Sequence, residues 1–171
     1  LIISLGTQAI IPRGLGPKAY GDFNYISNFF TQIISFLDMG TSVGFYTKLS
    51  QRPKESRLVS FYLYFSGIVS LVIVVFVLIA VMTSVQTILW PAQELVYIYF
   101  GVAWGILYWI VLVLNKMADA YGITVSTEIV RIFQKLFGLA LIVLLYAFHL
   151  LSLTNFFYYQ FILFLVLCVA F

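Results

Sequence analysis

The chain has 171 residues, of which 63% are hydrophobic and only 9% are charged, and its formal net charge is +3. A soluble domain has about 45–50% apolar and about 25% charged residues. Together with a mean hydropathy of +1.08, this composition excludes an ordinary soluble fold and predicts an all-α membrane protein, a polytopic bundle of about six transmembrane helices. The positive charge lies in loops that flank the predicted spans, so we expect no nucleic-acid partner.

The sequence begins and ends within apolar runs. The run at residues 1–11 is too short to cross a bilayer alone, and so is the last one, residues 158–171. Residue 1 is not Met, and neither a basic segment nor a cleavage pattern of a signal peptide accompanies the first run. We therefore interpret the chain as a fragment of a longer membrane protein, with a truncated span at each end.

A compact polar segment, RGLGPKAYG at residues 13–21, follows the first run. It contains three glycines and a proline; glycine is too flexible for a helix interior, and proline lacks the N–H donor. The segment therefore predicts a turn at which the chain reverses. Arg13 lies at the end of the first span, where its guanidinium either anchors the helix at the outer membrane interface or contributes to a substrate site.

The second predicted span, residues 22–47, carries an ordered set of polar side chains. They recur at alternating steps of four and three residues, which places them on one helix face; they are Asn24, Asn28, Thr31, Ser35, Asp38 and Ser42. Two interpretations remain open. The face is either a seam between helices joined by small polar groups or the wall of a water-filled cavity, since a carboxylate at membrane depth is costly and usually faces a bundle interior.

The remaining predicted spans are residues 58–85, 95–114, 124–153 and 158–171. The first of these has few polar residues, so we expect it to meet lipid over much of its surface. In the next, Gly101 and Gly105 have the small-xxx-small spacing that allows two helices to approach closely. The connections are predicted at residues 48–57, at Trp90 and Pro91, at residues 115–122, and at Thr154 and Asn155.

Basic residues predict the orientation in the membrane. Loops on one side carry seven of them, and the loop on the other side carries two, Arg13 and Lys18. Cytoplasmic loops are enriched in Lys and Arg, so we expect the 48–57 loop to face the cytoplasm and the 13–21 turn to face the outside. The seven are Lys48, Arg52, Lys54, Arg57, Lys116, Arg131 and Lys135.

Few residues are suited to catalysis or metal binding. His149 has no second His or Cys at ligand spacing, so we interpret it as a packed or hydrogen-bonded histidine. The sequence has no phosphate-binding glycine loop of the Walker type. It therefore predicts no catalytic residue, no metal site and no cofactor, and we do not expect an enzyme.

Two cations lie four residues apart on one face of the fifth predicted span, Arg131 and Lys135. A guanidinium matches phosphate oxygens, so Arg131 is a candidate for binding a phosphate or pyrophosphate group. The alternative is that both side chains extend to the lipid headgroups, with Glu128 one turn away as a partner. We favour the headgroups for Lys135 and leave Arg131 open.

Three short motifs resemble a known family. The segment LGPKAYG at residues 15–21, preceded by an arginine, resembles the R-x-LGPxxYG turn of bacterial polysaccharide biosynthesis proteins. These are the O-antigen and exopolysaccharide flippases of the multidrug/oligosaccharidyl-lipid/polysaccharide exporter superfamily. DMGTS at residues 38–42 is similar to the D-x-G-x-S near the inner end of that family's second span. DAYGIT at residues 119–124, followed by EIVR at residues 128–131, resembles its fourth-to-fifth-span loop. Lys18 departs from the family, where acidic residues are common.

The resemblance implies that residues 1–171 are the N-terminal lobe of a two-lobed transporter of about a dozen or more spans in the bacterial cytoplasmic membrane. Its cargo would be an undecaprenyl-pyrophosphate-linked oligosaccharide, moved to the outer leaflet by alternating access during synthesis of O-antigen, capsule or exopolysaccharide. Implied partners are this substrate, membrane lipid, the C-terminal lobe, and polysaccharide polymerase and chain-length proteins. The resemblance and the residue patterns together give these candidate cavity residues: Arg13, Asn24, Asn28, Thr31, Ser35, Asp38 and Arg131.

Two other functions stay open. A cation-coupled drug antiporter of the same superfamily would need an intramembrane carboxylate to couple protons or sodium, and Asp38 is the candidate that lies well inside this lobe. A non-transporting scaffold for polysaccharide synthesis enzymes would use helix contacts such as the Gly101 and Gly105 pair. A scaffold, however, has no need of a hydrated polar face.

Overall fold

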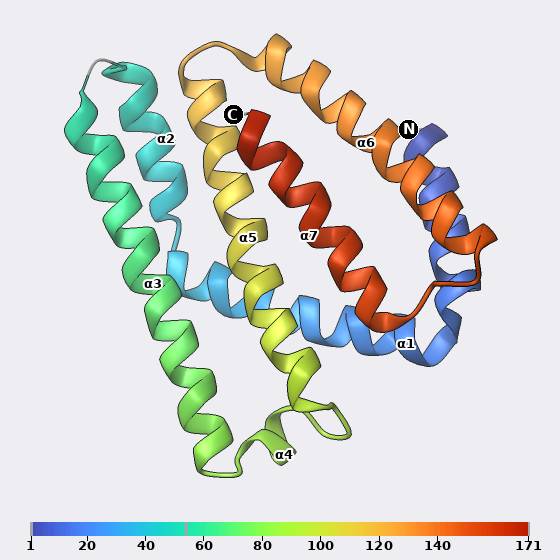
Figure 1. The fold of residues 1–171 in the computed structure, drawn as a ribbon. Helices are drawn as coiled ribbons and strands as arrows, with labels where there is room; N and C mark the ends of the chain where they lie inside the picture. Colours follow the sequence, from blue (N-terminus) through green and yellow to red (C-terminus); the bar gives the residue numbers. More distant parts are fainter. Residues whose placement is uncertain (1, 54, 171) are drawn as a thin grey trace. The chain divides into compact units, whose positions relative to one another are not determined.

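The computed structural model describes residues 2–53 and 55–170, with side chains from residue 6 onward except at residue 56. In this part of the chain all regular structure is helical, as the composition predicts (Figure 1). The helices are α1 (Ile2–Asp38), α2 (Thr41–Gln51), α3 (Ser56–Met82), α4 (Gln86–Leu89), α5 (Leu95–Ala120), α6 (Thr124–Ala147) and α7 (Leu153–Ala170).

Four of the described helices are long and apolar enough to cross a membrane, namely α3 from Arg57 to Met82, α5, α6 and α7. This length and composition are those of a multi-pass helical membrane protein. α1 is not among the four, because its polar residues lower its hydropathy. The count of six spans and the assignment of the chain to one lobe stay predictions.

α1 is broken at Gly16, whose φ of 79° and ψ of 162° lie in a region that is nearly exclusive to glycine. Pro17 follows and disfavours the helical conformation at the residue before it. The sequence predicts a reversing turn over residues 13–21, but the structure instead has helix on both sides of a single non-helical residue. α1 bends sharply there (Figure 1, dark blue). One glycine is enough to turn the chain because the next residue is proline.

The chain divides into two compact units, which we name by their place in the sequence. The terminal unit is Leu1–Tyr25 with Val125–Phe171, and the central unit is Ile26–Thr124. In the terminal unit, the first part of α1 lies close to the end of α6 and to the turn that follows it: a Cβ at Gly14 would lie 3.0 Å from Tyr146 Cδ2 of α6 and would overlap Leu151 of the turn. Phe23 also packs edge-on against Phe156 and Phe157 of α7, with ring centroids 4.7 and 5.2 Å apart.

The central unit is built on close contact between α1 and α5. A Cβ at Gly101 would lie 2.0 Å from Ile26 Cγ2, and one at Gly105 would lie 2.9 Å from Phe30 Cβ. The prediction that this glycine pair admits a second helix is therefore confirmed, and the partner is α1. Trp90, in the turn after α4, is almost fully buried and stacks on Phe30.

The predicted connection at Thr154 and Asn155 is wrong. α6 ends at Ala147, and the turn before α7 lies at residues 148–152, so Asn155 is in the first turn of α7. Ser152 is a good N-cap, since its hydroxyl oxygen accepts the backbone N–H of Asn155 at 3.2 Å. His149 is exposed in this turn with a φ of 54°, so the interpretation of it as a packed histidine within a span is also wrong.

Two predicted loops are shorter than their sequence patterns indicate. α2 continues to Gln51, so Lys48 belongs to its last turn and the connection to α3 is only residues 52–55. α5 likewise continues to Ala120, within the predicted 115–122 loop. Charged residues at these ends continue the helix, because Lys and Arg are good helix formers.

Candidate functional site

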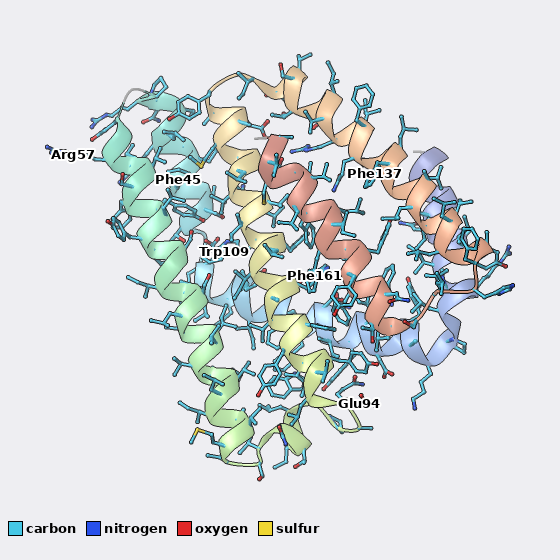
Figure 2. All side chains as sticks on the ribbon, in the orientation of Figure 1. Phe45, Arg57, Glu94, Trp109, Phe137 and Phe161 are labelled. Carbon is cyan, nitrogen blue, oxygen red and sulfur yellow. The ribbon has the colours of Figure 1, made fainter. Side chains whose placement is uncertain are left out.

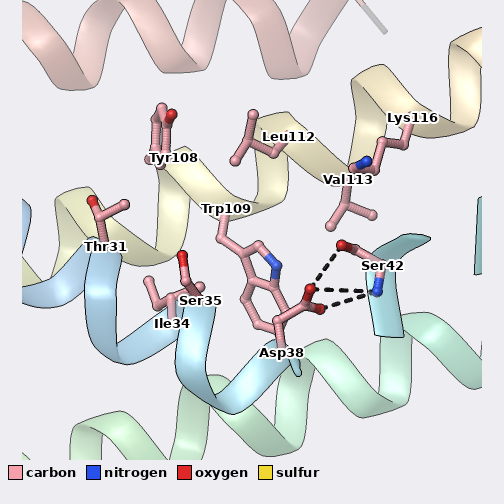
Figure 3. Close-up of a pocket in the computed structure, with 10 residues that line it drawn as sticks. All are labelled: Thr31, Ile34, Ser35, Asp38, Ser42, Tyr108, Trp109, Leu112, Val113 and Lys116. Carbon is pink, nitrogen blue, oxygen red and sulfur yellow. Dashed lines mark hydrogen bonds between the residues drawn. The ribbon is translucent and has the colours of Figure 1, made fainter. Parts of the chain in front are cut away.

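A pocket of about 140 Å³ lies within the central unit, between the end of α1, the start of α2 and the second half of α5 (Figure 3). Most of its polar groups come from α1 and α2, while α5 adds aromatic rings, aliphatic side chains and one cation. The residues that line it are Thr31, Ile34, Ser35, Asp38, Ser42, Tyr108, Trp109, Leu112, Val113 and Lys116.

Asp38 is buried, and its carboxylate accepts several hydrogen bonds. Its carboxylate accepts hydrogen bonds from Thr41 Oγ1 at 2.8 Å and from Ser42 Oγ at 2.7 Å. It also accepts the backbone N–H of Ser42 at 3.2 Å and the hydroxyl of Tyr62, on α3, at 3.2 Å. One carboxylate thus joins the end of α1, the start of α2 and the N-terminal part of α3.

The chain turns between α1 and α2 because of the residues that follow Asp38. Gly40 has a φ of 80° and a ψ of 7°, the left-handed conformation that favours glycine, and Met39 has a φ of 45°. The carboxylate then lies at the N-terminus of α2, where the unpaired N–H groups and the helix dipole stabilise a negative charge. We call residues 38–42 the α1–α2 corner.

The corner corrects the prediction of one uninterrupted span over residues 22–47. The polar periodicity still selects the right residues, since Thr31, Ser35 and Asp38 line the pocket from α1. Ser42 reaches the same pocket from α2, on the other side of the break.

On the α5 side, the pocket combines aromatic rings with a cation. Trp109 is buried, and Lys116 Nζ lies 5.9 Å from the centroid of the Tyr46 ring of α2, a cation–π distance. Lys116 and Asp38 give the pocket both a positive and a negative group.

Sequence reasoning did not identify Tyr62, Trp109 or Lys116 as site residues. Periodicity relates residues of one helix and cannot pair them with residues of another. A signal was present, since Tyr108, Leu112 and Lys116 are spaced four residues apart and therefore share one face of α5.

The other predicted site residues lie outside this pocket. Asn28 is exposed in the central unit. Arg13, Asn24 and Arg131 belong to the terminal unit, where Arg13 is exposed and Asn24 donates a hydrogen bond from Nδ2 to Tyr20 O at 2.9 Å. The structure therefore brings together three of the predicted residues and their neighbour Ser42.

Arg131 forms an ion pair with Glu128, one turn earlier on α6, so the predicted partnership is confirmed. The Arg131 side chain is partly buried, with 27% of its surface exposed. Lys135 is exposed.

The donors around Asp38 indicate what its carboxylate does. Both oxygens accept hydrogen bonds from hydroxyl or N–H groups, which is the pattern of a structural anion that fixes a helix terminus. Among the residues that the structure describes, no three His, Cys, Asp or Glu side chains are grouped as metal ligands would be.

The three motifs that carry the family resemblance have one feature in common. Each contains a glycine with positive φ, and in the described part of the chain these are the glycines with that conformation: Gly16, Gly40 and Gly122. Comparison of the chain with protein-family models, curated proteins and solved structures finds no match. The resemblance therefore rests on the motifs and on the backbone positions that they occupy.

Proposed function

We propose that the chain is one lobe of a flippase that moves an undecaprenyl-pyrophosphate-linked oligosaccharide across the bacterial cytoplasmic membrane. The observation that carries the proposal is the coincidence of motif and conformation. The motif glycines stand at the break in α1, at the α1–α2 corner and between α5 and α6, with φ values of 79°, 80° and 72°. The motifs thus fall on backbone positions that favour glycine, as the turns between the helices of such a lobe would require.

The pocket of the central unit is compatible with this proposal. Alternating-access transporters form their substrate sites from polar side chains on broken helices, and here the polar side chains that line the pocket lie on both sides of the α1–α2 corner. Lys116 adds a cation that suits an anionic headgroup. The lipid tail would remain in the bilayer while the pyrophosphate and sugars cross.

The first test uses the complete protein in cells that depend on it for polymer export. Arg13→Ala is expected to lower surface polymer at unchanged membrane abundance, because it removes a guanidinium that matches a pyrophosphate. Lys18→Ala, which removes a nearby cation at a position that departs from the family motif, is the matched control and is expected to leave export unchanged. Normal polymer in Arg13→Ala cells with equal protein levels would contradict a role for Arg13.

A cation-coupled antiporter is the second candidate, and it is favoured by the buried carboxylate of Asp38 among three hydroxyl groups. An Asp38→Asn variant separates the two candidates. In an ion-coupled antiporter it abolishes the dependence of transport on the ion gradient, even in the fraction of protein that folds. In the flippase that we propose, transport per folded molecule is expected to persist in this variant.

The scaffold alternative loses its main sequence argument. The Gly101 and Gly105 faces contact Ile26 and Phe30 of the same chain, so this pair is occupied within the central unit. A scaffold would therefore need another surface to bind its partner enzymes.

A further inference from the structure

Two further pockets lie in the central unit, on the surface shared by α2 and α3. The first, which we call the apolar groove, has a volume of about 340 Å³ and is lined mainly by aromatic rings. Its residues are Thr41, Gly44, Phe45, Lys48, Leu58, Phe61, Tyr62 and Phe65. The second, the basic pocket, also has a volume of about 340 Å³ and is lined by Lys48, Gln51, Arg52, Glu55 and Leu58.

The two pockets are adjacent, since Lys48 and Leu58 line both of them. Their chemistry changes from one to the other: the groove is aromatic and aliphatic, whereas the basic pocket holds charged side chains. A lysine suits such a boundary, since its methylene stem packs on apolar surface while its ammonium group stays among polar groups. The combined site therefore has an apolar part and a cationic end.

The cationic end lies in the most basic segment of the chain, where residues 48–57 contain four basic residues and one acidic residue. Arg57 extends outward from the first turn of α3, at the end that follows the connection from α2 (Figure 2). The acidic residue, Glu55, is 3.7 Å from the Arg52 guanidinium, whose side chain is 75% exposed. Such an exposed pair is weak, so the net positive charge remains available to an anion.

We propose that this site binds one anionic phospholipid, with its phosphodiester headgroup at Lys48 and Arg52 and part of an acyl chain along Phe61 and Phe65. Charge complementarity favours an anionic over a zwitterionic lipid, and the groove favours a lipid over a free phosphate. The predicted cytoplasmic position of this segment agrees, because the cytoplasmic leaflet holds anionic lipid that attracts basic residues close to the membrane.

Lipid binding also has a structural consequence. Tyr62 lines the groove, stacks on Phe45 with ring centroids 4.2 Å apart, and donates its hydroxyl to Asp38. A lipid bound in the groove therefore covers the residue that ties α3 to the α1–α2 corner. A ligand that binds the folded state raises its stability, so phosphatidylglycerol is expected to raise the melting temperature of the complete protein more than phosphatidylcholine does.

The test compares lipid retention by native mass spectrometry of the complete protein, using phosphatidylglycerol and phosphatidylcholine with the same acyl chains. Lys48→Gln/Arg52→Gln is expected to lower phosphatidylglycerol affinity by about fivefold for each cation removed. The control, Lys18→Gln, removes a cation that lines neither pocket, and it is expected to keep the affinity.

A second variant and its control test whether the lipid occupies the apolar groove. A Cβ at Gly44 or at Gly67 meets nothing within 4 Å, so both glycines accept a side chain without a clash at Cβ. Gly44→Leu fills the groove and is expected to reduce phosphatidylglycerol retention, whereas Gly67→Leu, on α3 and outside the groove, is not. Equal retention of the two lipids by the unmodified protein, or undiminished phosphatidylglycerol in both the charge variant and Gly44→Leu, would overturn the proposal.

Discussion

The helix is interrupted at Gly16 and again at the α1–α2 corner, and the two interruptions are stabilised in different ways. At Gly16 the turn depends on a backbone conformation next to a proline, and a Cβ there would touch nothing within 4 Å. At the α1–α2 corner, Gly40 supplies a milder left-handed conformation, and a buried carboxylate adds hydrogen bonds to α2 and α3. The first break is therefore determined locally, whereas the second depends on tertiary contacts.

Asp38→Ala is expected to lower the free energy of unfolding more than any other change, because it removes the hydrogen-bond acceptor of the α1–α2 corner. It leaves the buried Tyr62 hydroxyl and the first N–H groups of α2 without this partner, so we expect a loss of about 2–4 kcal/mol in the free energy of unfolding. The free energy of unfolding, measured in detergent micelles, gives the size of this loss. Asp119→Ala, which removes an exposed carboxylate, is the control, and an equal loss in both variants would show that the corner has no special dependence on Asp38.

Gly16→Ala is expected to lower the free energy of unfolding by about 2–3 kcal/mol, because residues other than glycine adopt the backbone conformation of Gly16 only with strain. Gly16→Asn is expected to be as destabilising, since Asn tolerates the left-handed helical region but not this one. The same unfolding measurement applies, with Gly67→Ala as a control at an open helical position. Wild-type stability in Gly16→Ala would mean that the break does not need glycine.

Gly40→Ala is expected to lower the free energy of unfolding by less, about 1–2 kcal/mol, because other residues adopt the left-handed helical conformation of Gly40 more easily than the conformation of Gly16. Here Gly40→Asn is expected to recover most of the loss, in contrast to the same substitution at Gly16. Comparing the unfolding free energies of the four variants sharpens the distinction between the two breaks. If Asn rescued both positions or neither, the two glycines would not differ in the way that their ψ values indicate.

Tyr62→Phe is expected to lower the free energy of unfolding least, by about 0.5–1.5 kcal/mol. This substitution removes one of several hydrogen bonds to Asp38 but keeps the ring stacked on Phe45. Tyr64→Phe, at an exposed position of the same helix, is expected to change nothing measurable. A double-mutant cycle with Asp38→Ala measures the coupling. Additive losses would contradict a direct bond between the two side chains.

The sequence predicts the local break well and the tertiary site only in part. Three glycines and a proline are enough to place a turn near Gly16, and the period of the polar residues correctly selects Thr31, Ser35 and Asp38. The all-helical membrane class follows from composition alone. These properties depend on residues close to one another in the chain.

What the sequence does not predict depends on distant residues. The end of α1 at Asp38 requires the left-handed Gly40, but the polar period passes through this point without interruption. Tyr62 and Lys116 join the site from other helices, and nothing in the order of residues pairs them with Asp38. The end of α6 is a local exception: the apolar pattern continues to residue 153, and Ser152, the N-cap of α7, is the local signal that the chain turns before it.

Transport in vesicles tests whether this chain is one lobe of a lipid-linked oligosaccharide flippase. The complete protein is reconstituted into liposomes with a fluorescent undecaprenyl-pyrophosphate oligosaccharide, and the fraction of its sugars accessible to an external enzyme is followed over time. We expect the protein to make sugars of both leaflets accessible faster than protein-free liposomes do, and we expect Arg13→Ala to slow this exchange while Lys18→Ala does not. Exchange no faster than in protein-free liposomes, from folded protein, would contradict the proposed function.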